Sequence, residues 1–351
     1  MNKTQINKLS IRIPDDMHVH LRRDQMLINV LPFTAYSFGR AMVKGNFNQR
    51  PIIDAGGVEN YRNEILTNVD TEFNPIMSIM FVKSTTPRTV AEANEAGARV
   101  LALIPGKTST GSDDGIALTE LKKYYSVLKT VCQKKMIFSI HLELVETPEG
   151  NAIKEPERER LAIPFLKQII KDIPGLKIVA EHVTTKELIN FIKQAPDNVS
   201  ATLTAHHAVL TRKDVFNEKG KIINPHNYCK PVAKTKKDRL AVTKAMTSGN
   251  PKFFFGSDSA PHPISKKMGD NPPAGIFSAP VALPLLCEIF DRKGKLNGLE
   301  NFVSRFGARF YNLPLNRGKI TLVREKWIVP FEYAGVGIFK AGETINWSIE
   351  D

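Results

Sequence analysis

Cysteine is scarce in this sequence. The 351 residues include three cysteines, Cys132, Cys229 and Cys287, which lie far apart and form no C-x-x-C pair. An odd and scattered set indicates a reducing compartment and argues against a zinc site built from thiolates. Long apolar runs are also missing, since no stretch approaches the ~20 residues of a membrane span. The first residues show no apolar segment after their charge, so we expect no secretory signal and a cytoplasmic protein.

Acidic residues are fewer than basic ones. Lys and Arg total 49 against 36 Asp and Glu, which gives a net charge of +13. The basic residues are scattered, and the densest runs, at 234–239 and 266–267, are not interleaved with aromatics. Solvated basic faces with a mild preference for anions explain this better than a nucleic-acid surface does. We therefore expect a small anionic partner and neither nucleic acid nor membrane.

Predicted strands and helices alternate through most of the chain. Apolar, β-rich runs occur at Ile11–Leu21, Arg40–Lys44, Pro75–Val82, Arg99–Ile104, Met136–Leu142, Lys177–His182, Asn198–Thr204 and Lys252–Ser257. Segments with helical spacing lie between most of them, at Val58–Leu66, Thr89–Ala96, Leu118–Val131, Pro156–Ile170, Thr185–Gln194 and Arg239–Met246. Strands that alternate with helices predict an α/β fold with a parallel sheet.

The number of these units favours a (β/α)8 TIM barrel, which needs ~250 residues. The alternative fold is a doubly wound open sheet. That fold would require a glycine-rich phosphate turn after the first strand, which this sequence lacks. We expect a single domain over 1–351, with the barrel at about 9–312 and a short C-terminal extension at 313–351 packed on it. The Gly269–Pro280 stretch is expected to form a long loop after the eighth strand.

The histidines gather where barrel enzymes carry their active sites. On these strand assignments each of the 8 lies at the carboxyl end of a strand or in the loop that follows. They are His18, His20, His141, His182, His206, His207, His226 and His262. One such histidine is more often a buried, hydrogen-bonded side chain than a ligand. All eight histidines at the carboxyl end of the predicted barrel indicate metal or acid–base chemistry.

The strongest local signal is His18-Val19-His20. Two residues apart on a strand, both imidazoles point the same way, as a pair of metal ligands must. H-x-H alone is a weak motif, but the eighth strand lies beside the first in a closed barrel and brings Asp258 next to the pair. That carboxylate could bind metal, accept a proton, or simply cap a turn. His141 and His182 add two inward imidazoles, and a cysteine-free set of this kind is typical of an open catalytic site.

Longer motifs around these residues resemble a known family. They are Pro14-Asp15-Asp16-Met17-His18-Val19-His20-Leu21-Arg22, Glu181-His182-Val183-Thr184-Thr185, Asn224-Pro225-His226-Asn227-Tyr228-Cys229-Lys230-Pro231, Gly256-Ser257-Asp258-Ser259-Ala260-Pro261-His262 and Phe277-Ser278-Ala279-Pro280. The sequence resembles dihydroorotases of the bacterial single-function type, within the amidohydrolase superfamily, from about Leu9 to Ser348.

The resemblance implies a zinc-dependent, cytoplasmic, homodimeric enzyme that interconverts N-carbamoyl-L-aspartate and L-dihydroorotate in pyrimidine biosynthesis. It implies that Asp258 is also the catalytic proton acceptor. The implied metal ligands are His18, His20 and Asp258 for one ion, and His141 and His182 for a second. The implied substrate-binding residues are Arg22, Asn46 and His262 for the carboxylate, Lys230 and Ala279 for the ring, and Ser109 and Thr110 in a loop that closes over the substrate.

The sequence departs from the family pattern at two strands. The family has a lysine at the end of strand four, carbamylated and bridging two metals, where this sequence has Ala102. Its usual Met-Pro-Asn after strand two is Lys44-Gly45-Asn46 here. Without a bridging anion two divalent cations repel strongly, so we expect one zinc and leave a second open. Lys44 could point inward, where it would bind an anion or weaken a metal, or outward.

Three hypotheses follow. The first is an active dihydroorotase-like hydrolase with one metal on His18, His20, Asp258 and His141, and His182 behind it or at a weak second site. The second is a cyclic amidase for another substrate. The third is a paralogue with weak or no activity that serves as a binding or partner subunit. The nitrogen and oxygen ligand set would also suit Mn, Co or Fe.

Overall fold

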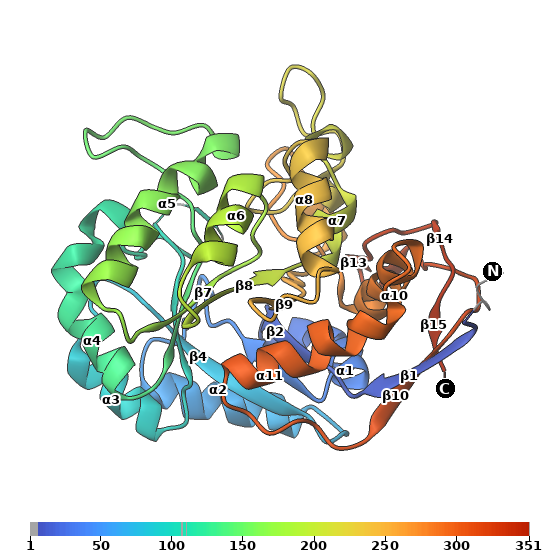
Figure 1. The fold of residues 1–351 in the computed structure, drawn as a ribbon, viewed down its shortest axis with the longest axis horizontal. Helices are drawn as coiled ribbons and strands as arrows, with labels where there is room; N and C mark the ends of the chain where they lie inside the picture. Colours follow the sequence, from blue (N-terminus) through green and yellow to red (C-terminus); the bar gives the residue numbers. More distant parts are fainter. Residues whose placement is uncertain (1–5, 107, 110, 351) are drawn as a thin grey trace.

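The computed structural model describes residues 6–106, 108–109 and 111–350. Its centre is a sheet of eight parallel strands in chain order (Figure 1). The strands are β2 (Asp15–Val19), β3 (Arg40–Val43), β4 (Asn74–Met80), β5 (Val100–Leu103), β6 (Ile137–Ile140), β7 (Lys177–Ala180), β8 (Val199–Leu203) and β9 (Phe253–Phe255). The sheet closes where Val19 bridges Ser259 and the Asp258 N–H donates to the His18 carbonyl at 2.8 Å. The predicted (β/α)8 barrel is confirmed.

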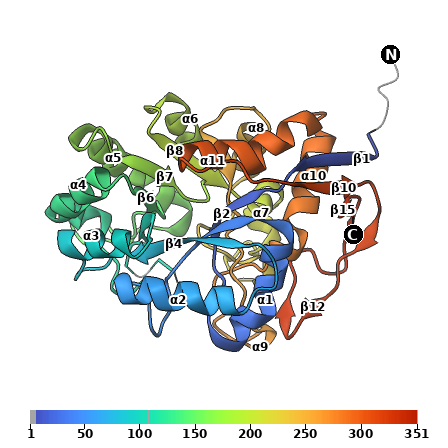
Figure 2. The ribbon, with the colours of Figure 1, turned by 90° about the horizontal axis from the view of Figure 1, so that it is seen from below.

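Helices connect and cover the strands (Figures 1 and 2). They are α1 (Asp24–Ser37), α2 (Ala55–Thr67), α3 (Pro87–Glu95), α4 (Tyr125–Gln133), α5 (Glu155–Asp172), α6 (Lys186–Gln194), α7 (Ala205–Val209), α8 (Lys236–Met246), α9 (Ile264–Lys267), α10 (Ala282–Arg292) and α11 (Phe306–Phe310). Side-chain caps start several of them: Asp54 caps α2, and Thr86 opens α3 with Pro87 at its first position. The expected helix Leu118–Val131 is divided into a 3-10 turn, Leu118–Tyr124, followed by α4.

Two layers of apolar side chains hold the barrel together. The larger lies between the strands and the helices and includes Phe38 and Tyr61. The smaller fills the barrel interior with Met42, Ala102, Phe254 and their neighbours. Phe310 and Tyr311, at the end of α11, pack on this interior layer and close the amino-terminal end of the barrel. The carboxyl ends of the strands are left for polar side chains.

Short antiparallel strands lie beside the barrel. β1 (Lys8–Arg12), β10 (Lys319–Val323) and β15 (Ser348–Ile349) form one small sheet, in the order β1-β10-β15. The other pairs are β11 (Trp327–Ile328) with β14 (Thr344–Ile345) and β12 (Glu332–Tyr333) with β13 (Val336–Gly337). The expectation of one strand over Ile11–Leu21 is therefore wrong. Pro14 has no N–H to continue a ladder, and the chain leaves one sheet for the other there.

None of the helices in the described part of the chain has both the length and the apolar character needed to cross a bilayer.

Candidate active site

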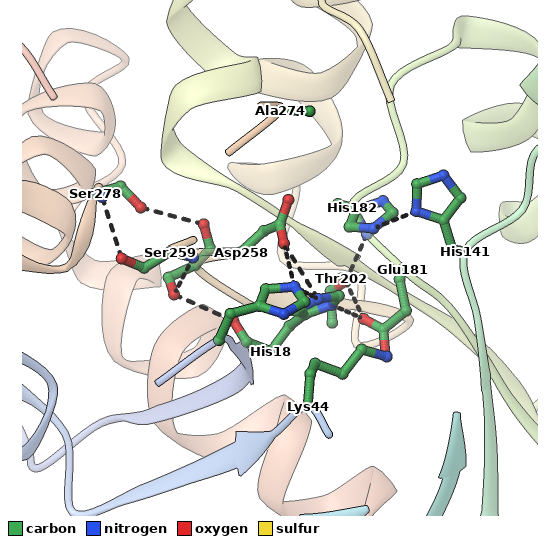
Figure 3. A network of polar contacts seen from close by, with 12 residues as sticks. His18, Lys44, His141, Glu181, His182, Thr202, Asp258, Ser259, Ala274 and Ser278 are labelled. Atoms are coloured by element: carbon green, nitrogen blue, oxygen red, sulfur yellow. Dashed lines mark hydrogen bonds and ion pairs between the residues drawn. The ribbon is translucent and has the colours of Figure 1, made fainter. Parts of the chain in front are cut away.

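His18, His20 and Asp258 converge at the open end of the barrel, and Figure 3 shows His18 and Asp258 there. The Nε2 atoms of the two histidines are 3.2 Å apart, and Asp258 Oδ1 lies 3.1 Å from His20 Nε2 and 3.2 Å from His18 Nε2. All three side chains are buried. Three donor atoms that face one point, with lone pairs on imidazole and carboxylate, fit a divalent metal ion of the zinc type.

The loop after β9 holds Asp258 in an unusual backbone conformation. Its φ is 45°, in a region that non-glycine residues rarely adopt. Ser257 Oγ donates to the His18 carbonyl, and the Ser257 N–H donates to Asp16 Oδ1 at 2.7 Å. His182 (φ 38°) is held in the same way outside the common regions. Strained backbone of this kind persists where the surroundings fix it, which is typical of functional sites.

Glu181 lies behind His18. The His18 Nδ1–H donates to Glu181 Oε2 at 2.7 Å, and Thr202 Oγ1 donates to the same oxygen at 2.8 Å. With its proton on Nδ1, His18 presents the Nε2 lone pair to the site. Burial alone would lower the pKa of His18, but Glu181 and Asp258 outweigh it and raise that pKa to about 9. The two carboxylates thus create a field that attracts positive charge, and a metal ion meets that demand.

The remaining histidine ligands follow a different pattern. Burial lowers the pKa of His20 to about 4, so its imidazole is neutral near pH 7. His182 Nε2 lies 3.1 Å from His141 Nδ1, and His141 Nε2–H donates to Glu143 Oε2 at 2.7 Å. Ligand atoms of His18, His182 and Asp258 all lie within 4.8 Å of one another. His182 therefore adjoins the first group of ligands, and His141 stands behind it.

The candidate substrate residues surround these ligands. A pocket at the open end of the barrel is lined by His18, His20, Arg22, Asn46, Ile104, Ser109, His141, His182, Lys230, Asp258, Ala260, Ala274 and Gly275. Arg22 Nη2 lies 3.1 Å from His262 Nε2, and Arg22 Nε donates to the Pro261 carbonyl. A guanidinium fixed in this way can present its fork to a carboxylate.

Two of the expected substrate contacts, His262 and Ala279, are not among the residues that line this pocket. The Ala279 N–H donates to Ser259 Oγ at 3.1 Å. Ala274 and Gly275 line the pocket instead, although the sequence analysis did not single them out. The predicted Gly269–Pro280 loop could have indicated them, because a loop that follows the eighth strand must lie at the mouth of the barrel. Thr110 lies outside the described residues.

Lys44 points into the barrel. Its side chain is fully buried, and Nζ donates to Ser139 Oγ at 3.1 Å and lies 3.7 Å from Glu181 Oε1. The sequence left its direction open. An inward Lys44 was expected to bind an anion or weaken a metal. Glu181 was given no role, and the available signal was that it adjoins the predicted site residue His182.

A second group of possible ligands lies after β8. His206, His207 and Cys229 are buried with ligand atoms within 4.8 Å of one another. His207 already uses both ring nitrogens, since Nδ1 bonds Thr204 Oγ1 at 2.9 Å and Nε2–H donates to the Pro231 carbonyl at 2.9 Å. Burial raises the pKa of the Cys229 thiol, which keeps it protonated. The group is less suited to metal than the site at Asp258.

Comparison with known proteins assigns this constellation to a family. No family model matches the sequence. A dihydroorotase of Teredinibacter turnerae is 38% identical over 351 residues, covering 98% of this chain and 99% of its own. A dihydroorotase of Sphingopyxis alaskensis is 40% identical over 347 residues, with 98% and 99% covered. The chain belongs to the dihydroorotase family.

A solved structure supports the same assignment. The dihydroorotase of Saccharomyces cerevisiae, in complex with 5-fluoroorotic acid, superposes with a TM-score of 0.91 at 30% identity and covers 98% of this chain and 99% of its own. As a dihydroorotase-family member the protein is a metal-dependent cyclic amidohydrolase of pyrimidine biosynthesis, which acts on a C–N bond. The hypotheses of an inactive partner subunit and of another cyclic amidase are not favoured.

Proposed function

We propose that the protein interconverts N-carbamoyl-L-aspartate and L-dihydroorotate, using a zinc ion held by His18, His20 and Asp258. The observation that carries this proposal is the convergence of their donor atoms within 3.2 Å, beside Arg22, at the mouth of the barrel. Two imidazoles and a carboxylate leave coordination positions free, as a catalytic ion requires. His182 and His141 are the candidates for a second, weaker ion.

Asp258 is the proposed proton acceptor. When bound, the ion would polarise the ring amide and lower the pKa of water. Although burial opposes ionisation, His18 and its neighbours hold the pKa of Asp258 well below the usual range. Asp258 therefore enters the reaction as a carboxylate, as a proton acceptor must. It takes the proton of the attacking water and passes it to the leaving ring nitrogen; synthesis runs through the same groups in reverse.

The substrate carboxylate is proposed to bind to Arg22, Asn46 and His262. Burial lowers the pKa of Arg22 to about 10, which leaves the guanidinium charged at neutral pH. Its contact with His262 and the Pro261 carbonyl fixes its plane before substrate arrives. Such preorganisation reduces the entropy that binding costs. Lys230 and Ser109 line the same pocket and would contact the rest of the molecule.

Ring opening of dihydroorotate by the purified, zinc-loaded protein tests the proposal. We expect turnover by the wild-type protein and a loss of roughly a thousandfold or more in Asp258→Asn, because a positioned base contributes about 10²–10⁴ and Asp258 is also a ligand. Arg22→Met should weaken substrate binding more than turnover. Hydantoin, a different cyclic ureide, is the control substrate. Hydrolysis of hydantoin alone, or binding of dihydroorotate without conversion, would overturn the proposal.

Three further assignments accompany this one. A single functional domain is supported by β1, which precedes the barrel but pairs with β10 beyond it. A cytoplasmic location is supported by three cysteines that form no disulfide. A homodimer is supported by an apolar groove between α1 and the C-terminal strands, lined among others by Phe33, Tyr36, Trp327 and Tyr333.

A further inference from the structure

Lys44 is an ammonium group buried inside the barrel, directly below the candidate ligands. It follows β3, its side chain has no exposed surface, and Figure 3 shows its amine beside Glu181 and beneath His18. Burying a lysine costs free energy unless an anion and hydrogen bonds compensate. Here the compensation comes from Glu181 Oε1 at 3.7 Å and Ser139 Oγ at 3.1 Å.

The ammonium contacts Ser139, the register partner of Ala102. Ser139 on β6 is the register partner of Ala102 on β5, so the two side chains point to the same face of the sheet. Ala102 belongs to the layer that fills the barrel interior, and its methyl group takes up less space there than a longer side chain would. The side chain of Lys44 crosses from β3 to reach Ser139, so it takes up space that a long side chain at position 102 would need.

The charge of Lys44 adds to the field at the ligands. It opposes protonation of His18, while Glu181 and Asp258 favour it. One metal ion at His18, His20 and Asp258 would be balanced by those two carboxylates. A second ion at His182 and His141 would add another positive charge to a buried site in which the Lys44 ammonium already acts on His18. In a buried site that repulsion is weakly screened.

We propose that Lys44 is a built-in cation that limits this site to a single metal ion, by filling the space that a bridging side chain at position 102 would need and by placing a fixed positive charge beside the ligands. The inference rests on the proposed metal site and goes beyond it, because it assigns the limit on metal stoichiometry to one side chain of another strand. Lys44 touches neither substrate nor reacting atoms and is a positioning residue.

Zinc binding by the full chain tests this role without reference to activity. We would measure zinc per chain by mass spectrometry after dialysis, and the affinity of a second site by competition with a chromophoric chelator. The wild-type protein should hold one zinc. Lys44→Met and Lys44→Gln, which remove the charge, should bind a second zinc roughly tenfold or more tightly than the wild type does. Lys44→Arg keeps the charge and should stay at one.

The controls separate the possible failures. Lys177→Met removes a lysine whose Nζ donates to the Phe310 carbonyl at the opposite end of the barrel, and it should leave zinc binding unchanged. If Lys44→Met fails to fold because Glu181 has lost its partner, Lys44→Gln decides, since its amide can still donate to Ser139. A second site no tighter than in the wild type overturns the proposal. A fall in zinc content also overturns it, because Lys44 would then support a metal, as a carbamate would. Absence of zinc from the wild type would instead refute the proposed metal site itself.

Discussion

Glu181 lies behind His18 and determines which ring nitrogen that histidine presents to the site. Its Oε2 accepts from His18 Nδ1 and from Thr202, while Oε1 faces Lys44. Burial opposes its ionisation, but His18 and Lys44 outweigh this and lower the pKa of Glu181 to about 2. The carboxylate is therefore charged at any pH where the protein works, and it orients its ligand constantly.

Glu181→Gln is expected to weaken zinc binding by about 10–100-fold, because an amide accepts a weaker hydrogen bond from His18 and reduces its basicity. Competition with a chromophoric chelator measures this. Glu288→Gln is the matched control: Glu288 is also buried, but it contacts Asn346 and Arg292 far from the ligands. Equal zinc affinity in Glu181→Gln and wild type would contradict the proposed orienting role.

At the level of single residues, the sequence could predict which ligands meet but not what surrounds them. His18 and His20 share a strand face by simple alternation, and barrel closure brings Asp258 to them. The direction of Lys44 could not be deduced, because a polar side chain at the end of a strand can turn to either face. It points inward, where Glu181 supplies an anion and Ser139 accepts a hydrogen bond. Both facts depend on strands far from Lys44 in the sequence.

Among the elements, the short strand β9 determines where the candidate ligand Asp258 lies. It has three residues, all buried phenylalanines, and Gly256 follows them between β2 and β8. A Cβ at Gly256 would lie 2.8 Å from His18 Cβ and 3.0 Å from Thr202 Cβ. Only glycine lets the chain pass this close to both strands, and Asp258 comes two residues later.

Gly256→Ala is expected to destabilise the fold by about 1–3 kcal/mol, because β2 and β8 must separate to admit the methyl group. Urea unfolding measures the change, and zinc affinity should fall with it because His18 and Asp258 are displaced. Gly56→Ala, in the first turn of α2, is the control. Its added Cβ would have 3.7 Å to its nearest neighbour, so stability should hold or rise slightly. Equal losses in both variants would show that the contact at Gly256 is unimportant.

Most of the barrel elements could be predicted because their patterns are local. The strands from β3 to β9 lie within the predicted runs to a residue or two. Two long helices gave no usable signal. α1 contains Pro32, which a sequence pattern treats as a break, and α10 is buried over nine of its residues and so lacks a polar face. The sequence did not show that β1 belongs to a separate sheet, because its partner, β10, lies about three hundred residues later.

Across the whole molecule, the candidate ligands come from opposite sides of the barrel. His18 and His20 belong to β2 and its end, His141 and His182 follow β6 and β7, and Asp258 follows β9. The proposed ion on His18, His20 and Asp258 would link the first strand of the barrel to the last. Binding to the folded state alone stabilises that state by mass action.

Chelation of the proposed zinc ion should therefore lower the thermal midpoint, by roughly 5 °C if free zinc had stood at about a thousand times its Kd. Calorimetry with and without a chelator measures the shift, and added zinc should restore the midpoint. Asp258→Asn is the comparison variant, since it should show little response to chelator. An unchanged midpoint in the wild type would mean that the ion is not shared between strands.

The hydrogen bond from the Asp258 N–H to the His18 carbonyl joins the first barrel strand to the last. During synthesis, a nascent chain that ends at β8 already holds both histidines of the H-x-H pair, yet their carboxylate partner has not been made. Closure of the barrel and completion of the proposed metal site therefore depend on the same segment of the chain. A chain that ends at β8 cannot bind an ion through His18, His20 and Asp258 together, so we expect activity only after the barrel has closed.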